Sequence, residues 1–220
     1  PDDNYISVIM PVFNQASFIR RAIVSLLNQT HKNWELIIIN DGSTDKLEEA
    51  ISSFLDDKRI RIFHNSSNEG LGYSLNKGID NSKYDYIAYL PADDIYYKNH
   101  LENLLESINL GFDFAHAGMI HEFQSLFGDN GNFGRKVYHK LENMAFQLVQ
   151  VLHRKTQERW IERNELESDD LNELFWNKYL QKNTKTIGTR EITCEWVNHP
   201  TQRHKIIDEH YGGNIFLFKS

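Results

Sequence analysis

The sequence predicts an α/β fold in which helices cover both faces of a parallel sheet, over residues 1 to about 110. Short runs rich in Ile, Val, Tyr and Phe that are bounded by Asn, Asp, Gly or Pro are typical of buried strands. Four such runs occur: ISVIMPVF, WELIIIN, RIRIFHN and YDYIAYL. Helical patterns alternate with them, which favours parallel strands joined by right-handed crossovers.

The predicted helices follow from apolar residues spaced three and four apart, because such residues share one helix face. A third helix is expected to start near Gly72. The other sets are Phe18, Ala22, Ile23, Leu26 and Leu27; Leu47, Ala50, Ile51, Phe54 and Leu55; and Leu101, Leu104, Leu105 and Ile108.

The second half, residues 111–220, is expected to pack onto the first half as one continuous domain, because no repeat or proline-rich linker separates them. The glycine-rich stretch FGDNGNFGRK predicts a loop. A strand is expected from Thr186 to Trp196. Helical spacing predicts a further helix, leading into the basic segment HRKTQERWIER, from Leu141, Met144, Ala145, Leu148, Val151 and Leu152.

Composition excludes several classes of protein. A chain of 220 residues that is 40% hydrophobic can bury a substantial core. The 31 acidic residues against 24 basic ones give a net charge of −7, which is the wrong sign for binding nucleic acid. No apolar run approaches the roughly 20 residues of a membrane span, and the acidic opening does not resemble a signal peptide, so an intracellular protein is expected. The single cysteine, Cys194, excludes an internal disulfide and is expected to be a small buried side chain.

Two acidic turns close apolar runs in the first 95 residues. IIINDGSTD ends at Asp45, and YIAYLPADD ends at Asp94. Such turns place carboxylates at the carboxyl ends of buried strands, where open α/β sheets bind their ligands. Together the turns predict a nucleotide and metal site.

The motifs VIMPVFNQASFIRRAIVSLLNQT, WELIIINDGSTD, NEGLGYSLNKGI and YIAYLPADD resemble, in order and spacing, those of family 2 glycosyltransferases. The resemblance covers about residues 6 to 110. It implies the GT-A fold, a Rossmann-type mixed and mainly parallel sheet flanked by helices. It also implies transfer of a sugar from a nucleotide diphosphate donor, usually with inversion and with Mn²⁺ or Mg²⁺. Residues 1–110 would bind the nucleotide-sugar, and residues 111–220 would bind the acceptor.

Three residues are candidates for binding the nucleotide base. Pro11 and Phe13 follow the first strand and could form a flat apolar wall, where stacking of a base on an aromatic ring is worth about 1–3 kcal/mol. Asp41 could accept a hydrogen bond from a base ring N–H. The alternatives are a core role for Phe13 and a simple Asp-Gly turn at Asp41. The resemblance places Phe13 at the uracil-stacking position and Asp41 at the uridine-binding position, which implies a UDP-sugar donor.

The second acidic turn supplies the candidate metal ligands. Carboxylates at a strand end suit Mg²⁺ or Mn²⁺, although either one could instead cap the following helix. The resemblance implies that Asp93 binds the metal, with Asp94 as the second choice for that ligand or as a contact to the ribose or the donor sugar. This chain has Pro91 where the family commonly has a further acid. His199 resembles a histidine near the donor phosphates in many relatives, as a metal or diphosphate ligand, with an ordinary loop residue as the alternative.

The candidate catalytic base lies in ELESDDLNELFWNKYL. Inversion requires a base that takes the proton of the acceptor hydroxyl. This segment resembles the acidic pair that precedes an amphipathic helix in the family, which implies Asp170 as the base with Asp169 beside it. The choice between the two stays open, and Asp169 could instead cap the helix.

The resemblance points to a glycan or glycolipid acceptor in bacterial cell-envelope polysaccharide synthesis, on the cytoplasmic side, with peripheral contact to the inner face of the membrane as an open alternative. A catalytically inactive protein that binds a nucleotide-sugar or glycan is the competing interpretation. Donor sugar, linkage and oligomeric state stay open.

A basic run could bind a phosphorylated acceptor or anionic lipid, although its spacing favours a solvated helix face. Its members are His153, Arg154, Lys155, Arg159 and Arg163.

Overall fold

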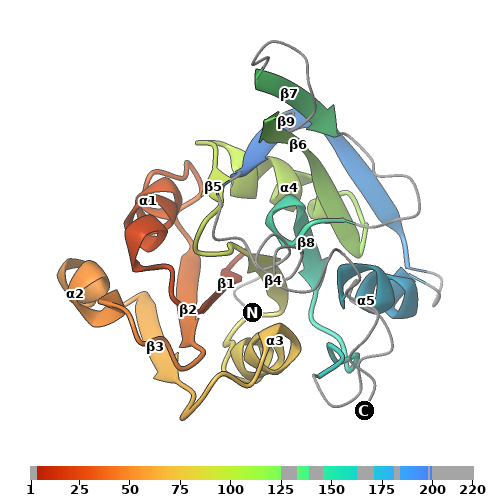
Figure 1. The fold of residues 1–220 in the computed structure, drawn as a ribbon. Helices are drawn as coiled ribbons and strands as arrows, with labels where there is room; N and C mark the ends of the chain where they lie inside the picture. The colour runs from red at the N-terminus through yellow and green to blue at the C-terminus, as the bar shows by residue number, and fades with distance from the viewer. Residues whose placement is uncertain are drawn as a thin grey trace, which may run out of the picture.

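A mixed β-sheet forms the centre of the protein, and helices lie on both of its sides (Figure 1). The computed structural model describes residues 4–124, 133–138, 146–162, 171–180, 184–197 and 199. Four strands of the first half lie in the order β3-β2-β1-β4 and run parallel, which confirms the α/β prediction for this half. Their bounds are Ile6–Val12 for β1, Trp34–Asn40 for β2, Ile60–His64 for β3 and Tyr86–Tyr89 for β4.

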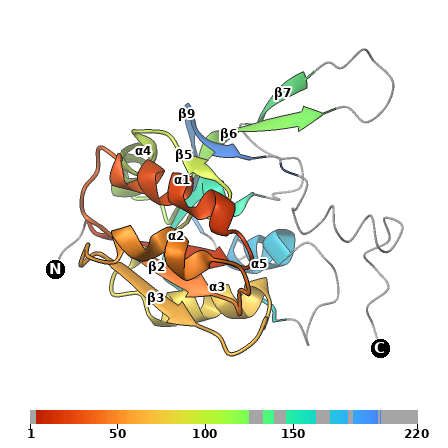
Figure 2. The same ribbon diagram turned by 60° about the vertical axis from the view of Figure 1, so that its left-hand side comes forward.

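The sheet continues from the first half into the second without a break. Strand β4 pairs antiparallel with β8, β8 antiparallel with β6, β6 parallel with β9, and β9 antiparallel with β5. Strand β7 pairs only with β6 among the described strands, and this hairpin projects from the body (Figure 2). The bounds are Ile95–Tyr96 for β5, Phe114–Gln124 for β6, Phe133–Tyr138 for β7, Val151–Arg154 for β8 and Thr186–Trp196 for β9.

Each face of the sheet packs against its own helices. Helices α1, α2 and α4 contribute to one core, and α3 and α5 contribute to the other. Successive side chains of a strand point to opposite faces, so Val8 and Met10 join the first core and Ile9 joins the second. This double burial explains the uninterrupted apolar strands. The bounds are Ala16–Leu27 for α1, Leu47–Ile51 for α2, Leu71–Asp80 for α3, His100–Asn109 for α4 and Leu171–Leu180 for α5.

The helix predicted from the spacing of Leu148, Val151 and Leu152 is wrong in its described part. Only Leu148–Gln150 is helical, as a single 3₁₀ turn, and Val151–Arg154 forms strand β8. The strand fills the place between β4 and β6, where Val151 joins one core and Leu152 the other. Pairing on both sides therefore overrides a spacing that would also suit a helix. The predicted loop FGDNGNFGRK is likewise wrong from Phe133 onward, where β7 begins.

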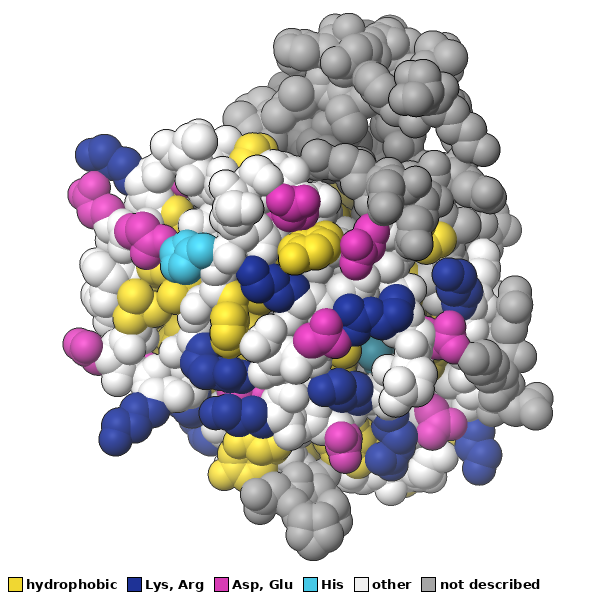
Figure 3. Space-filling view, turned by 90° about the horizontal axis from the view of Figure 1, so that it is seen from below, with side chains coloured by type: hydrophobic (Ala, Val, Ile, Leu, Met, Phe, Trp, Pro, Cys, Tyr) yellow, Lys and Arg dark blue, Asp and Glu magenta, His cyan; other side chains and the backbone are white. Residues whose placement is uncertain are grey.

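The basic run is not a solvated helix face. His153 lies in β8 and is buried, and the Arg154 guanidinium lies 3.7 Å from the Asp113 carboxylate. Lys155 Nζ donates to Ser82 Oγ at 2.8 Å. On the face seen from below (Figure 3), Lys and Arg side chains are interspersed with Asp and Glu rather than gathered in one basic patch. Arg163 lies outside the described residues.

The expectation that Cys194 is buried is confirmed, and two tryptophans of the second half are buried as well. Trp160, Trp176 and Cys194 are each at most 1% exposed. Trp160 stacks on Phe175 of α5 with ring centroids 4.0 Å apart. Among the described helices, none combines the length and the apolar composition needed to span a membrane.

Candidate active site

The two acidic turns lie on the same edge of the sheet. Strand β1 pairs in parallel with β2 on one side and with β4 on the other, so the carboxyl ends of all three strands meet there. Asp41 directly follows β2, and Asp93 and Asp94 follow β4. Phe13 follows β1, between them. The topology therefore places the predicted nucleotide and metal residues along one edge.

Hydrogen bonds join the loop after β1 to the turn after β2. The Asn14 amide donates to Ser43 Oγ at 3.0 Å, and the Thr44 amide donates to Asn14 Oδ1 at 2.8 Å. Asn14 adopts a φ of 52°, a left-handed conformation that Asn tolerates. Gly42 has a φ of +72°, and a Cβ there would lie 2.6 Å from the Ser67 carbonyl carbon. This rigid corner holds the Phe13 ring 43% exposed, while Pro11 is buried in β1.

The Asp41 carboxylate is held by three donors among the described residues. Its Oδ1 accepts from Asn65 Nδ2 at 2.7 Å and from the Glu69 amide at 2.9 Å, and its Oδ2 accepts from the Gly70 amide at 2.9 Å. A carboxylate offers about four acceptor positions. Asp41 is 5% exposed, and among the described residues one acceptor position on Oδ2 has no donor.

The structure brings Asp93 and His199 together although they lie 106 residues apart. Asp93 Oδ2 and His199 Nε2 are 2.9 Å apart, and their side chains are 13% and 5% exposed. The His199 ring stacks on Phe18 of α1 with centroids 4.2 Å apart. The segment that follows β9 thus closes against the turn after β4 and against α1.

Asp94 has a different partner from this pair and is 3% exposed. Its Oδ1 accepts a hydrogen bond from the Val197 amide at 3.1 Å. Burial, and then the charge of neighbouring Asp93, raise the pKa of Asp94 well above its usual range. The contact with Val197 anchors the chain two residues before His199.

Asp93 and His199 suit a divalent cation that arrives with a diphosphate. The Asp93 oxygen and the His199 nitrogen that face each other are 2.9 Å apart. Two ligands of the same metal ion could lie at a similar distance from each other. In the described part of the chain, no group of three or more His, Cys, Asp or Glu residues is placed to hold a metal. Mg²⁺ is commonly held by one or two carboxylates together with substrate phosphates and water rather than by an all-protein cage. The Asp93 carboxylate fits that mode of binding, and His199 would add a nitrogen ligand.

Asp169 and Asp170 lie outside the described residues. The helix predicted after them is confirmed, because α5 begins at Leu171. The last described residue before Asp169 and Asp170 is Glu162.

Residues 159–162 dock along α3, which sequence reasoning missed. Arg159 binds the Asp80 carboxylate through two hydrogen bonds of 2.5 and 2.9 Å. The Asn76 amide group exchanges two bonds of 2.9 Å with the backbone of Trp160. A Cβ on Gly72 would collide with the carbonyl oxygen of the residue after Trp160. The sequence did contain a signal for this contact, which is the spacing of Gly72, Asn76 and Asp80. Residues four apart share one helix face, so a small residue and two polar residues lie together there.

The docked segment leads toward the edge of the sheet that carries Asp41. It contacts α3 at Asp80 first and at Gly72 last, so it runs toward the amino end of that helix. Gly70, which immediately precedes α3, donates to Asp41. The described chain therefore runs toward this edge as far as Glu162.

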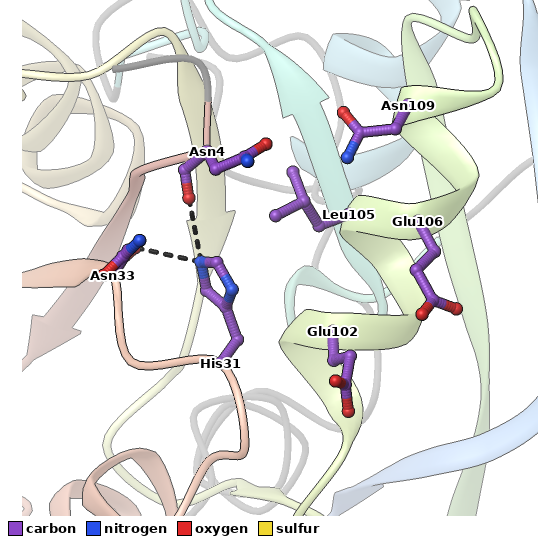
Figure 4. A pocket seen from close by; sticks show the side chains of 7 residues that line it. All are labelled: Asn4, His31, Asn33, Glu102, Leu105, Glu106 and Asn109. Atoms are coloured by element: carbon purple, nitrogen blue, oxygen red, sulfur yellow. Dashed lines mark hydrogen bonds between the residues drawn. The ribbon is translucent and has the colours of Figure 1, made fainter.

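A pocket of about 290 Å³ lies elsewhere, between α4 and the loops that precede β1 and β2 (Figure 4). His31 Nε2 faces the carbonyl oxygens of Asn4 at 2.8 Å and Asn33 at 3.1 Å. These residues precede parallel strands, so the pocket lies at the edge opposite the acidic turns, and none of the predicted site residues lines it. Its lining is Asn4, His31, Asn33, Glu102, Leu105, Glu106 and Asn109.

Known sequences similar to this chain are glycosyltransferases by name. An uncharacterized glycosyltransferase of Rickettsia felis is 46% identical over 116 residues, which are 52% of this chain and 19% of that protein. One from Haemophilus influenzae is 43% identical over 101 residues, 46% of this chain and 40% of that protein. Glycosyltransferase GlyG of Streptococcus pneumoniae is 34% identical over 104 residues, 47% of this chain and 35% of that protein. The matches thus span less than half the length of these relatives.

Solved structures share the fold. S. aureus TarS 1-349 in complex with UDP-GlcNAc matches with a TM-score of 0.72 and 17% identity, over 90% of this chain and 60% of that chain. Mannosyltransferase PcManGT from Pyrobaculum calidifontis, in complex with GDP-Man and Mn²⁺, matches with a TM-score of 0.68 and 14% identity, over 96% of this chain and 62% of that chain. At these identities the likeness concerns the fold alone, and it confirms the predicted GT-A architecture.

The model of one family, Glycosyl transferase family 2, matches residues 7–165 and so spans both acidic turns and the segment docked on α3. Because that match covers most of the chain, this protein belongs to glycosyl transferase family 2.

Proposed function

We propose that this chain transfers a sugar from a UDP-sugar to an acceptor hydroxyl with inversion, assisted by Mn²⁺ or Mg²⁺. The observation that carries the proposal is the Asp93–His199 pair on the same sheet edge as the Asp41 carboxylate. Structures of the same fold with UDP-GlcNAc, and with GDP-Man and Mn²⁺, support a nucleotide-sugar donor.

The base would bind between Phe13 and Asp41. The Phe13 ring is 43% exposed and offers a surface for stacking, with Pro11 packed within β1 behind it. The acceptor position left on Asp41 would take a ring N–H. Uracil carries such an N–H, whereas the corresponding nitrogen of cytosine is an acceptor. Asp41 would therefore favour uridine nucleotides over cytidine nucleotides.

Asp93 and His199 would hold the cation. A cation held there would supply positive charge that stabilises the leaving diphosphate. Phe18 keeps the His199 ring in place by stacking. We assign Asp94 an indirect role toward the nucleotide, because its bond to the Val197 amide holds the chain that carries His199.

Asp170 would act as the general base, with Asp169 as the alternative. The acceptor oxygen would bond to the anomeric carbon from the face opposite UDP, its proton would pass to the carboxylate, and the bond from the anomeric carbon to UDP would break. We place the acceptor, a glycan or glycolipid of the bacterial envelope, against the second half of the chain.

Calorimetry of UDP, GDP and CDP, first with Mn²⁺ and then with EDTA, tests the donor site. We expect UDP to bind in Mn²⁺ and to bind much more weakly in EDTA. The titration is followed by incubation with a panel of UDP-sugars, in which release of UDP reports turnover. Binding of UDP without metal dependence and without turnover would support the competing interpretation, a protein that binds a nucleotide-sugar without transferring it.

A further inference from the structure

A chain of hydrogen bonds connects the Asp41 carboxylate to Lys77 of α3. Lys77 Nζ donates to Asn65 Oδ1 at 2.7 Å and to the His64 carbonyl oxygen at 2.8 Å. Asn65 Nδ2 then donates to Asp41 Oδ1 at 2.7 Å. Asn65 is 9% exposed, so its bond to Asp41 is buried, while the bonds of Lys77 lie nearer the surface.

Chemistry at both ends determines which way the Asn65 amide points. An ammonium group only donates hydrogen bonds, so the Asn65 atom that faces Lys77 must be the oxygen. An ionised carboxylate only accepts them, so the atom that faces Asp41 must be the nitrogen. The Asn65 nitrogen also lies 3.2 Å from Ser74 Oγ, which can take its second hydrogen. The orientation of the amide is thus set by its neighbours.

The same orientation determines what Asp41 can still bind. With Asn65 and the Glu69 amide on Oδ1 and the Gly70 amide on Oδ2, the carboxylate is held at three points. If Lys77 were absent, the Asn65 oxygen would lose its charged partner, and only the Asp41 carboxylate and Ser74 would hold the amide. Asn65 would then be less firmly placed, and so would the Asp41 oxygen that it binds at 2.7 Å.

We propose that Lys77 is a positioning residue that acts through Asn65 to hold the Asp41 carboxylate, and that it thereby sets the preference for a base with a ring N–H, such as uracil, over cytosine. The inference rests on the proposed binding of a uridine nucleotide at Asp41. It assigns Lys77 no contact with the donor phosphates, because two of its three N–H groups already bind protein oxygens.

The test compares uridine, UDP and CDP by calorimetry in Mn²⁺, for the wild-type protein and for Lys77→Met. We expect Lys77→Met to weaken the binding of uridine and of UDP by about tenfold and to leave CDP binding nearly unchanged, so that the preference for UDP over CDP falls by the same factor. Lys77→Arg, which retains a charged donor, should restore most of this preference. Lys58→Met is the matched control, because Lys58 is exposed and precedes β3 at the opposite edge of the sheet.

Several outcomes would overturn the inference. Equal weakening of UDP and CDP with unchanged binding of uridine would show that Lys77 contacts the phosphates. An unchanged preference for UDP would show that Asp41 does not depend on Lys77. If Lys77→Met does not fold, as judged by circular dichroism, Lys77→Ala removes the same contacts with the residue that a helix tolerates best, and it should cause the same loss. Failure of the wild-type protein to bind any of these ligands would instead overturn the proposed function, and the inference with it.

Discussion

Adjacent acidic residues in this protein have very different surroundings. Asp94 is 3% exposed and binds the Val197 amide, whereas the Asp93 side chain is 13% exposed and faces the His199 ring. Asp94 therefore serves to hold the chain at Val197, whereas Asp93, which faces an imidazole, is the one placed to bind a metal. We therefore expect the two aspartates to respond differently to substitution.

Asp93→Asn should remove the metal dependence of donor binding. An amide is a weaker ligand for a divalent cation than a carboxylate, so we expect UDP affinity in Mn²⁺ to fall at least tenfold and affinity in EDTA to change little. Calorimetry measures both. Asp56→Asn, at an exposed position, serves as the control for the loss of one negative charge. Unchanged affinity of Asp93→Asn in Mn²⁺ would remove Asp93 from the metal site.

Asp170→Asn should separate binding from turnover. If Asp170 is the general base, its loss should lower kcat by about 10²- to 10⁴-fold, while UDP affinity stays the same. Steady-state assays of sugar transfer and calorimetry give the two readouts. Asp169→Asn is the matched variant, and retention of turnover by Asp170→Asn together with its loss in Asp169→Asn would assign the base to Asp169.

At the scale of elements, α3 has two neighbours that matter for the site. Its amino end follows the Gly70 amide that binds Asp41, and its outer face binds residues 159–162 through Asn76 and Asp80. Helix α3 therefore lies between the residues around Asp41 and residues 159–162. This packing depends on close approach of the backbone at Gly72.

Gly72→Ala should loosen this contact. The added methyl group would collide with a backbone carbonyl, which cannot rotate away as a flexible side chain can. We expect a loss of about 1–3 kcal/mol in the free energy of unfolding, measured by urea denaturation. Asp80→Asn weakens an exposed ion pair at the other end of the contact and should cost less than about 1 kcal/mol. An equally small effect of both substitutions would mean that the segment is not tightly packed on α3.

At the scale of the whole molecule, the two halves share a buried polar chain around His153. Its Nδ1 donates to the Arg154 carbonyl oxygen at 2.8 Å, so its Nε2 must accept the hydrogen bond from the Tyr89 hydroxyl at 2.9 Å. Trp160 Nε1 donates to the same hydroxyl at 3.3 Å. The side chains of Tyr89, His153 and Trp160 keep these hydrogen bonds only while His153 is neutral. Burial lowers the pKa of His153 from 6.5 to about 4.

Acid should therefore destabilise the protein through His153. Between pH 6.5 and about 4 the unfolded chain binds a proton at His153 that the folded protein does not, so stability falls as the pH falls. The contribution has a slope of up to about 1.4 kcal/mol per pH unit. Urea denaturation from pH 7.5 to 4.5 should show this slope as the difference between the wild-type protein and His153→Gln. His100, whose pKa burial lowers to about 3, and Asp94 are common to both proteins and cancel from the difference. A slope common to both proteins would contradict the assignment.

Much of the first half could be predicted because its information is local. The four apolar runs became β1 to β4, and the turns after β2 and β4 lie on the predicted edge of the sheet. Topology explains this success, since parallel strands joined by right-handed crossovers bring their carboxyl ends together. The second half was less predictable, because Val151 and Leu152 have a spacing that suits a helix and became a strand only by pairing with β4 and β6.

The sequence by itself determined the parallel half of the sheet, the two acidic turns and the resemblance to the family, because these depend on neighbouring residues and on their order. The tertiary structure decided the pairing of Asp93 with His199, the docking of residues 159–162 on α3 and the link from Lys77 through Asn65 to Asp41. Each of these contacts joins side chains that are distant in the sequence or belong to different elements. Their geometry exists only after the sheet and helices have packed, so no local pattern in the sequence could specify it.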